Sequence, residues 1–335
     1  MSSASLIIPT YKRVFFIDRI IRSLLSQDVS LLKEIIIVDS DSNDGTKELV
    51  ASYKNNKKLN LIYENVDNSV GLKRNKGIKV AKSEYLIFID DDCIPLNGFV
   101  ADHINSCREQ GKQINCGSVY FSKYFVKESN YIRYRDSRHA PYRNDIKIDK
   151  ILLDYRSIVT MNMSIRRKDL IDNNLFFNKS FIGYGMEDNE FGCKAENLGF
   201  NICYTNASIV HLESGNAQEY AKKIYHTSRD GVSKFKKINP EAIEKLRYSF
   251  YFEKDYKHDN MLESFSIKVF RVFFNIKIAK LMLRALVATD QIKILYTKHC
   301  YRYVYACYYK KGVEDRNNAY QLQTEVSRSW YKEDL

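Results

Sequence analysis

Residues 85–92 read Tyr-Leu-Ile-Phe-Ile-Asp-Asp-Asp, five β-forming residues that run directly into three carboxylates. Similar short runs of strand-forming residues occur at 5–8, 34–38 and 60–63. The segments between these runs have helical spacing, as shown by Ile17, Ile20, Ile21, Leu24 and Leu25. This alternation predicts βαβ units, and therefore an α/β fold in which helices cover both faces of a mostly parallel sheet.

Polar residues follow three of these predicted strands where each one ends. Pro9-Thr10 follows the first strand, Asp39-Ser40-Asp41 follows the second, and Asp90-Asp91-Asp92 follows the strand at 85–89. Sheets of this kind bind ligands at the carboxyl ends of their strands. Three adjacent acids repel one another unless a cation compensates them, so we predict a divalent metal that bridges a diphosphate. A solvated acidic turn before the next helix is the alternative.

Two further segments lie near this edge of the predicted sheet. Gly71 to Gly77, Gly-Leu-Lys-Arg-Asn-Lys-Gly, opens the helix before the acidic strand and brings cations to a helix N-terminus, where phosphates bind. By itself this signal is weak, because a basic helix face is usually only solvated. Asp44 and Thr46 are explained equally well as a helix cap, whereas Asp39 is better placed to accept a base N–H.

Together these segments resemble glycosyltransferase family 2, whose members have the GT-A (Rossmann-like) fold. Residues 8–13 are similar to the family's opening strand and loop, 39–42 to its base-binding segment, 71–77 to its basic helix and 90–92 to its DxD motif. The resemblance covers about residues 4–110 in continuous order. It implies that Asp92 ligates the metal, and that the donor is bound by Pro9, Thr10, Arg13, Asp39, Arg74, Asp90 and Asp91.

A second block, Gly183-Tyr-Gly-Met-Glu-Asp-Asn-Glu-Phe191, resembles the Glu-Asp motif of galactosyltransferase-type members. In that motif the acidic pair binds the acceptor hydroxyl and deprotonates it. Tyr184 stands where a tryptophan is usual and Met186 where a small residue is usual, departures that bear on the acceptor more than on the chemistry.

Helical spacing separates the two acids of this block. Asp188 recurs with Phe191, Ala195 and Leu198 at steps of three and four, so we expect it on the inward face of the helix. A different stripe carries Glu187, Glu190, Lys194 and Asn197. We predict Asp188 as the general base and Glu187 as its acceptor-binding partner; exchanged roles are the alternative.

His211, in Val-His-Leu-Glu at 210–213, resembles the strand-end histidine that completes the metal site in this family. A lone histidine is more often structural, and the acidic triplet is what favours a ligand role here. A shell of carboxylate and imidazole suits Mn²⁺ and tolerates Mg²⁺.

The net charge of +12 is concentrated in the C-terminal part of the chain. Residues 264–313 hold ten Lys and Arg against one acid, Asp290. We therefore predict a GT-A catalytic domain at 1–215, with nucleotide-sugar binding in 1–110 and acceptor binding and catalysis in 111–215, followed by a basic, aromatic, helical extension at 216–335. Within the catalytic domain, strands are expected at 115–121 and 158–165. The stretch between them, which holds Arg133, Arg135, Arg138, His139 and Arg143, is expected to be a loop-rich insertion near the site.

The basic extension suggests where the protein acts. The start of the chain has no signal-peptide pattern, and no uncharged apolar run approaches the roughly 18 residues that span a bilayer. Cations flanked by phenylalanines and leucines favour peripheral attachment to the anionic inner leaflet of the plasma membrane, from the cytoplasm, with a helix break near Asn275. Ordinary packing of these helices with a solvated basic rim is the alternative.

The seven cysteines show no metal-ligand spacing and are expected to be reduced packing thiols.

These observations predict an inverting, metal-dependent transfer of one sugar from a UDP-sugar to a saccharide, lipid-linked as in bacterial O-antigen or capsule synthesis. Inversion and UDP come from the family resemblance. Residues 323–330 differ in spacing from the QxxRW signature of processive synthases, which favours single addition. A nucleotidyltransferase and a nucleic-acid-binding protein are the alternatives; the second would use the basic region and Tyr296, Tyr301, Tyr303, Tyr305, Tyr308 and Tyr309. The concentration of charge in the tail, away from the predicted site, leads us to expect no nucleic acid partner.

Overall fold

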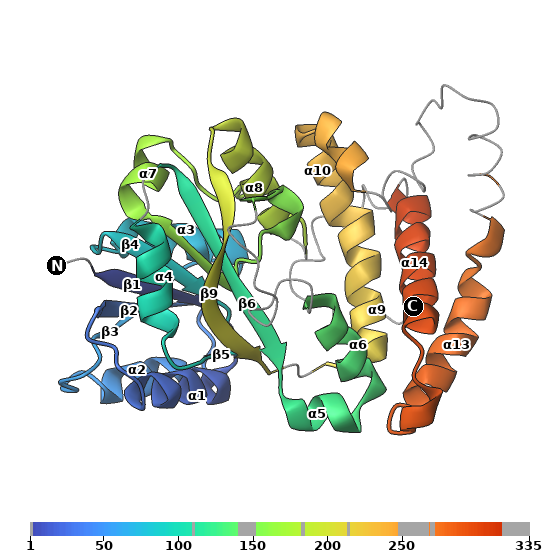
Figure 1. The fold of residues 1–335 in the computed structure, drawn as a ribbon, viewed down its shortest axis with the longest axis horizontal. Helices are drawn as coiled ribbons and strands as arrows, with labels where there is room; N and C mark the ends of the chain where they lie inside the picture. Colours follow the sequence, from blue (N-terminus) through green and yellow to red (C-terminus); the bar gives the residue numbers. More distant parts are fainter. Residues whose placement is uncertain are drawn as a thin grey trace. The chain divides into compact units, whose positions relative to one another are not determined.

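The computed structural model describes residues 3–108, 111–139, 152–181, 185–212, 215–246, 268 and 272–316 (Figure 1). The chain forms two compact units. The first consists of residues 1–123, 135–180 and 188–213, and the second of residues 124–134, 181–187 and 214–335.

The first unit is built on one sheet. Among the described residues its strands follow the order β3-β2-β1-β4-β8-β6-β9-β5, with β7 paired to β9. The β3-β2-β1-β4 block is parallel, and β8 runs antiparallel to both β4 and β6. The bounds are β1 (Ala4–Pro9), β2 (Leu32–Asp39), β3 (Leu61–Asn65), β4 (Tyr85–Ile89), β5 (Cys93–Pro95), β6 (Gln113–Phe121), β7 (Leu152–Leu153), β8 (Asn162–Arg166) and β9 (Asn201–His211).

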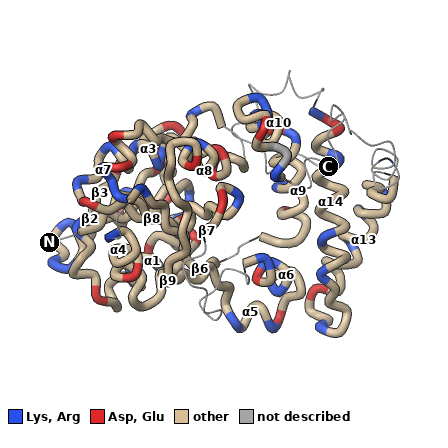
Figure 2. Tube along the Cα trace, turned by 45° about the horizontal axis from the view of Figure 1, so that its top comes forward, with Lys and Arg blue, Asp and Glu red and all other residues tan. Residues whose placement is uncertain are grey.

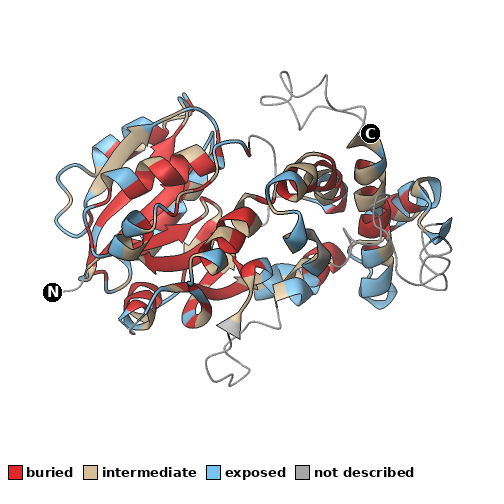
Figure 3. Cartoon of the chain, turned by 90° about the horizontal axis from the view of Figure 1, so that it is seen from above, coloured by how far each residue is buried: buried red, intermediate tan, exposed pale blue. Residues whose placement is uncertain are grey.

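Helices flank this sheet, which confirms the predicted α/β fold (Figure 1). The central strands β1 and β4 are buried along their whole length, and β2 is buried except at Lys33, as their apolar runs require (Figure 3). Helix α1 buries four of the five apolar residues that predicted it, Ile17, Ile20, Ile21 and Leu24. The helices are α1 (Val14–Leu25), α2 (Thr46–Ser52), α3 (Val70–Val80), α4 (Phe99–Cys107), η2 (Tyr155–Ser157), α7 (Arg167–Asp172) and α8 (Glu187–Asn197).

The strands expected at 115–121 and 158–165 correspond to β6 and β8, but the prediction of a loop-rich insertion between them was wrong for part of its length. Two helices, α5 (Lys123–Glu128) and α6 (Asn130–His139), occupy it, and α6 carries the predicted basic residues up to His139. Arg143 lies outside the described residues. The helix is stabilised by distant aromatic contacts: the Tyr131 ring lies 6.2 Å from that of Tyr220, and the Tyr134 ring stacks at 5.0 Å on that of Tyr301. Local periodicity cannot register such contacts.

The described residues of the second unit after 215 are also largely helical, as expected for the C-terminal extension. Tyr301, Tyr305 and Tyr308 are buried in it, so three of the six tyrosines between residues 296 and 309 pack in a core. Asn275 caps α13 by accepting hydrogen bonds from the Lys277 and Ile278 amides, which confirms the predicted helix break. The elements are α9 (Ala217–His226), the π-helical turn η3 (Thr227–Gly231), α10 (Val232–Ile238), η4 (Glu241–Lys245), α13 (Ile276–Ala288), η5 (Lys293–Leu295) and α14 (Lys298–Asp315).

Two sequence expectations bear on the whole described chain. None of the helices in the described ranges has both the length and the apolar character needed to cross a bilayer. The seven cysteines all lie in described ranges, and no disulfide joins any two of them.

Helix α3 lies so close to β1 that a side chain at position 77 would overlap the strand. A Cβ atom on Gly77 would stand 2.4 Å from Cγ2 of Ile7, which is completely buried in β1. The absence of a side chain at Gly77 therefore lets helix α3 pack directly on β1, close to the carboxyl edge of the sheet.

We expect Gly77→Ala to lower the free energy of unfolding by about 1–2 kcal/mol. Overpacking costs about 1–3 kcal/mol, and the better helix propensity of alanine offsets part of that cost. Urea denaturation followed by circular dichroism measures the change. Lys79→Ala, an exposed position of the same helix, is the control. Combining Gly77→Ala with Ile7→Ala should give less than the sum of the two single losses, and a stabilised Gly77→Ala variant would contradict the close contact.

Candidate active site

The carboxyl ends of β1, β2 and β4 meet at one edge of the sheet. These strands are parallel neighbours, with Pro9 beside Val38 and Ile7 beside Phe88. The edge therefore carries Thr10, Asp39 and the acidic triplet, three groups far apart in sequence. Every predicted site residue except Glu187 belongs to the first unit.

Arg13 compensates two acids of the triplet. Its Nη1 atom lies 3.0 Å from Oδ1 of Asp91 and 2.7 Å from Oδ2 of Asp92. The Thr10 hydroxyl donates to the other oxygen of Asp91 at 2.9 Å. Burial raises the pKa of Asp91 to about 7, against the opposing effect of Arg13 and with the added repulsion of Asp92. The triplet is thus a concentration of negative charge that the protein only partly offsets.

Arg74 connects the triplet to the start of helix α8. Its Nη2 atom donates to Oδ1 of Asp90 at 3.0 Å, and its Nη1 atom donates to Oδ1 of Asp188 at 3.0 Å. The guanidinium is buried and lies 5.3 Å from the centre of the Phe177 ring. Burial raises the pKa of Asp90, although Arg74 acts in the opposite direction. One buried cation therefore joins the acids of two motifs that lie about a hundred residues apart.

Asp188 has a second partner that sequence reasoning missed. The Thr160 hydroxyl donates to Oδ1 of Asp188 at 2.7 Å, and the Thr160 amide lies 3.4 Å from Oδ2. Oδ1 thus receives two strong hydrogen bonds and Oδ2 one long contact. Thr160 is completely buried just before β8, and nothing in its sequence neighbourhood indicates this role.

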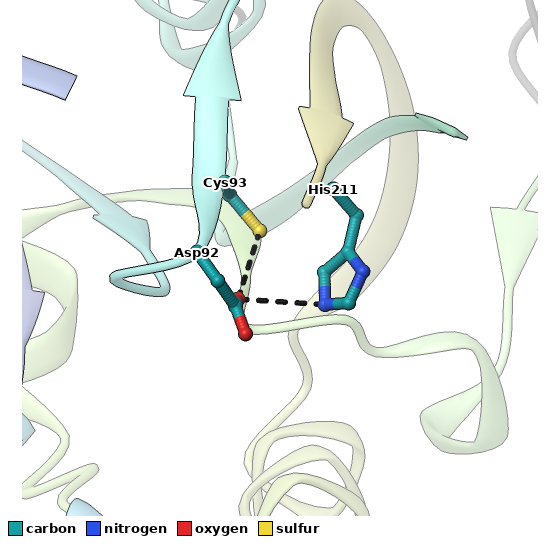
Figure 4. A group of neighbouring side chains, drawn as sticks. All are labelled: Asp92, Cys93 and His211. Atoms are coloured by element: carbon teal, nitrogen blue, oxygen red, sulfur yellow. Dashed lines mark hydrogen bonds and ion pairs between the residues drawn. The ribbon is translucent and has the colours of Figure 1, made fainter. Parts of the chain in front are cut away.

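Strand pairing assembles a potential metal centre. β5 runs antiparallel to β9 with Cys93 opposite His211, while Asp92 directly precedes Cys93 (Figure 4). His211 Nε2 lies 3.4 Å from Oδ1 of Asp92, and the Cys93 thiol donates to the same oxygen at 3.7 Å. One ligand atom of each residue lies within 4.8 Å of the others. The carboxylate and the imidazole are suitable donors for Mn²⁺, so the donor set fits the predicted metal. Cys93 was missed as a neighbour, because only the β5–β9 pairing brings it to His211.

Asp39 and Asp44 have different surroundings. Asp39 is buried and accepts hydrogen bonds from the Tyr63 hydroxyl at 2.9 Å and from the amide and hydroxyl of Ser42. Asp44 accepts from the Val14 amide at 2.9 Å and from the amide and hydroxyl of Thr46. Asp44 thus joins the starts of α1 and α2. This is the helix-capping role that the sequence allowed as one explanation of Asp44.

Lys73 is a cation at the same edge that the sequence did not single out within the basic helix. Its Nζ atom donates to the Thr10 carbonyl at 2.7 Å and to Oδ1 of Asn68 at 2.9 Å. Burial lowers its pKa to about 8, although Asp39 and Asp91 act in the opposite direction. The edge therefore holds Arg13, Lys73 and Arg74 close to the acids.

The start of α8 differs in part from the sequence expectation. Glu187 is the first residue of the helix and is half-buried, as is Asp188. Glu190 was expected on an outer stripe, and this expectation was wrong, because Glu190 is buried. Gly185 and Met186 both have left-handed backbone, with φ of 90° and 73°. Such a conformation is unusual for methionine and is often found at functional sites. Gly183 and Tyr184 lie outside the described residues.

Residues 5–174 match the sequence model described as "Glycosyl transferase family 2". The chain belongs to glycosyl transferase family 2. As a member of this family it is a glycosyltransferase, and the family resemblance expected from the motifs is confirmed.

Curated relatives of this family 2 enzyme are distant. The uncharacterized glycosyltransferase YfnE of Bacillus subtilis is 26% identical over 59% of this chain and 62% of its own length. Poly(ribitol-phosphate) beta-N-acetylglucosaminyltransferase TarS of Staphylococcus aureus is 27% identical over 67% of this chain and 36% of its own. A GalNAc(5)-diNAcBac-PP-undecaprenol beta-1,3-glucosyltransferase of Campylobacter jejuni is 26% identical over 55% and 57%. The chain thus spans less than two thirds of each of these relatives.

Solved structures share the fold. Residues 1–349 of S. aureus TarS align over 95% of this chain and 92% of that one, with a TM-score of 0.51 and 18% identity. The mannosyltransferase PcManGT from Pyrobaculum calidifontis, solved in complex with GDP-Man and Mn²⁺, aligns over 92% and 86%, with a TM-score of 0.58 and 16% identity. At these identities the likeness shows the GT-A fold that the sequence predicted for this family 2 enzyme.

Arg74→Gln should lower the free energy of unfolding by about 1–3 kcal/mol, because it leaves two partly buried carboxylates without their shared cation. The same loss should be smaller when Asp90→Asn is already present, since one of the two charges is then gone. Urea denaturation of the four proteins of this cycle measures the coupling. Arg22→Gln breaks an exposed, solvent-screened ion pair with Asp18 on α1 and should change the stability very little. Equal costs for Arg74→Gln and Arg22→Gln would contradict the bridging role.

Proposed function

We propose that this glycosyltransferase moves a single sugar from a UDP-sugar to a saccharide hydroxyl, with inversion at the anomeric carbon and with a divalent metal bound. The observation that carries this proposal is the Arg74 guanidinium, which holds Asp90 of the acidic triplet and Asp188 of helix α8 at 3.0 Å each. It brings the predicted donor-binding and acceptor-activating acids into one site.

The donor is bound along the edge formed by β1, β2 and β4. Asp39, buried at the end of β2, accepts an N–H of the base, and the cations Arg13 and Lys73 lie where the diphosphate is held. Asp90 would contact the ribose or the metal, and Asp91, which Thr10 and Arg13 hold in place, belongs to the same donor site. The residues assigned to the donor are Pro9, Thr10, Arg13, Asp39, Arg74, Asp90 and Asp91.

Asp92 and His211 are the proposed metal ligands, supported by the 3.4 Å separation between their carboxylate and imidazole atoms. Mn²⁺ is the expected ion and Mg²⁺ an acceptable one. The ion, when bound, would act as a Lewis acid and offset the negative charge of the departing diphosphate. Arg13 shares this task, because its ion pairs with Asp91 and Asp92 already offset part of their charge.

Asp188 is the proposed general base. The acceptor oxygen attacks the anomeric carbon, its proton passes to Oδ2 of Asp188, and the bond from the anomeric carbon to the phosphate oxygen breaks with its electron pair going to UDP. Oδ2 suits this role because Oδ1 is already engaged by Thr160 and Arg74. Glu187 precedes Asp188 at the helix start and binds the acceptor. A single displacement of this kind inverts the anomeric configuration.

The proposed acceptor is a lipid-linked saccharide of bacterial surface-polysaccharide synthesis, such as O-antigen or capsule. The Campylobacter relative supports this class, because its name describes transfer to an undecaprenol-linked glycan. In this proposal residues 1–215 carry out the reaction, and residues 216–335 hold the enzyme near its lipid-borne substrate.

We expect one UDP-sugar to give the fastest UDP release in a screen of the common UDP-sugars with Mn²⁺. EDTA should abolish this release, and added Mn²⁺ should restore it. Asp92→Ala and His211→Ala should each weaken Mn²⁺-dependent UDP binding by at least about tenfold, measured by calorimetry, because each removes a ligand. UDP binding without metal should change much less. Full turnover in EDTA would remove the metal assignment, and a lack of discrimination against GDP-sugars would remove the UDP assignment.

Asp188→Asn should lower kcat by at least about a hundredfold while leaving folding and UDP binding intact, because it removes the proton acceptor but keeps the shape. Glu187→Gln is the matched control and should raise the acceptor KM more than it lowers kcat. Steady-state kinetics with saturating donor separates the two effects. If Glu187→Gln shows the larger kcat loss, the two roles are exchanged.

Exposed residues of the second unit support the membrane assignment. The outer face of α13 carries Lys277, Ile278, Lys280, Leu281 and Arg284, all exposed, while Ala279, Leu283 and Leu286 on its other side are buried. Phe273 and Ile294, at either end of this helix, are 70% and 90% exposed. Lysines and arginines also recur along α10 and α14 of this unit (Figure 2). An apolar face interspersed with cations is complementary to an anionic lipid surface, so we propose that α13 binds the membrane.

Lys277→Glu combined with Lys280→Glu should weaken binding to phosphatidylglycerol-containing vesicles by at least about tenfold, since each cation near the surface contributes about 1 kcal/mol. Co-sedimentation with vesicles of 30% phosphatidylglycerol and with purely zwitterionic vesicles measures the difference. Lys47→Glu with Lys54→Glu, on the first unit, is the control for net charge. Equal binding by both double variants, or no binding at low salt, would reject attachment through α13. Concentration-dependent self-association lost on Leu281→Ser would instead identify a second copy as the occupant.

A further inference from the structure

A cavity of about 500 Å³ lies in the first unit and is lined by none of the residues assigned to the transfer reaction. Its wall comes from α3, from the segment 174–179 and from α8. It includes one acid, Glu190, and three lysines, Lys79, Lys179 and Lys194. Asparagine side chains and Phe176 complete much of the remainder.

Glu190 is the unusual member of this lining. The residue is only 5% exposed, yet its carboxylate has little compensation. Oε1 accepts one long hydrogen bond, 3.4 Å, from Asn178, and Oε2 has no hydrogen-bond partner among the described residues. Burial raises the pKa of Glu190, against the opposing effects of Asn178 and Lys194. A buried acceptor left unsatisfied costs about 1–3 kcal/mol, so a ligand that donates hydrogen bonds here would recover free energy.

The lysines favour an anion in the same cavity. Lys79 and Lys179 are exposed at its rim, and Lys194 is half-buried, with its Nζ atom 3.2 Å from the Asn174 carbonyl. Three cations face one acid, so the lining is positive overall. A ligand that only donates hydrogen bonds would not use this charge, and a cationic ligand would be repelled by it.

The other side chains have the character of a sugar site. Amides bind hydroxyl groups in either direction, and an aromatic ring such as Phe176 packs on the apolar face of a pyranose. The wall is rigid, because the Asn75 side chain makes two hydrogen bonds to the backbone of Phe177. Its Nδ2 atom donates to the Phe177 carbonyl at 2.8 Å, and its Oδ1 atom accepts from the Phe177 amide at 2.9 Å. Few, well-placed polar groups on a preformed wall are what small-ligand sites present.

We propose that this cavity is a second saccharide site that binds an acidic sugar, one whose hydroxyl groups donate to Glu190 and whose phosphate or carboxylate lies among Lys79, Lys179 and Lys194. The site goes beyond the transfer reaction, and its occupancy requires neither UDP nor metal. It would let the enzyme hold part of an anionic glycan away from the reacting hydroxyl.

Glucose 6-phosphate and glucuronate are suitable probes, since they share the sugar and differ in the anion. Saturation-transfer NMR on the full chain, without nucleotide, should show saturable binding of both. Lys79→Ala combined with Lys179→Ala should weaken the binding at least about fivefold, whereas Lys47→Ala with Lys54→Ala, exposed lysines at and after α2, should change it less than about twofold. Arg13→Ala, at the proposed donor edge, should also leave it within about twofold, which separates this site from the donor site.

Two further arms decide between a sugar site and a simple anion patch. Inorganic phosphate should bind at least about fivefold more weakly than glucose 6-phosphate. Glu190→Gln, which keeps the shape but removes a negative charge, should weaken glucose 6-phosphate binding at least about threefold, although charge alone predicts tighter binding. Tighter binding to Glu190→Gln, equal binding of phosphate, or no effect of the lysine pair would each overturn the proposal. Loss of probe binding in Arg13→Ala would assign the signal to the donor edge and overturn it as well.

Discussion

The structure of the site depends on one buried guanidinium that lies between two carboxylates. Arg74 bonds to Asp90 on the strand side and to Asp188 on the helix side, and its planar fork can serve both at once. Without this cation the triplet and the start of α8 would repel each other at short range in surroundings of low polarity. The position of Arg74 therefore sets the distance between the acidic triplet after β4 and the start of α8.

Several packing contacts around helix α3 position the Arg74 guanidinium. Gly77 lets α3 approach β1, and Asn75 on the same helix clamps the backbone of Phe177. The Phe177 ring lies beneath Arg74 and stacks at 4.3 Å on Phe191 of α8. Helix α3 and helix α8 are thus joined by one aromatic pair and one cation. These contacts fix the position of Asp188 at the start of α8. The Thr160 hydroxyl then orients its Oδ1 atom through a hydrogen bond.

The second unit is organised differently, around aromatic rings. The rings of Tyr134, Tyr301 and Tyr305 lie within 6.2 Å of each other, and Asp290 accepts hydrogen bonds from the Ser129 hydroxyl and the Tyr131 amide. Tyrosine contributes both a large apolar surface and a polar tip, which explains how a basic sequence still forms a core here. The cations of α13, Lys277, Lys280 and Arg284, lie on the outside, with the exposed Ile278 and Leu281 among them.

The sequence alone determined the α/β fold with its parallel strands, the family, and the acidic residues that follow the strands. Strand-forming runs and the residues that follow each strand are local properties of the chain. The helix break near Asn275 was also predicted locally, because the cations before and after it would fall on opposite sides of one straight helix. In the structure the Asn275 side chain caps the amides two and three residues further on. Only the tertiary structure brought Cys93 to His211, Thr160 to Asp188 and Arg74 to both Asp90 and Asp188, since each of these contacts joins segments separated by many residues. It also reversed two local readings, placing Glu190 in the interior and folding residues 130–139 into a helix. Periodicity records how a residue faces its own element, whereas burial and catalytic geometry depend on which other elements pack against it.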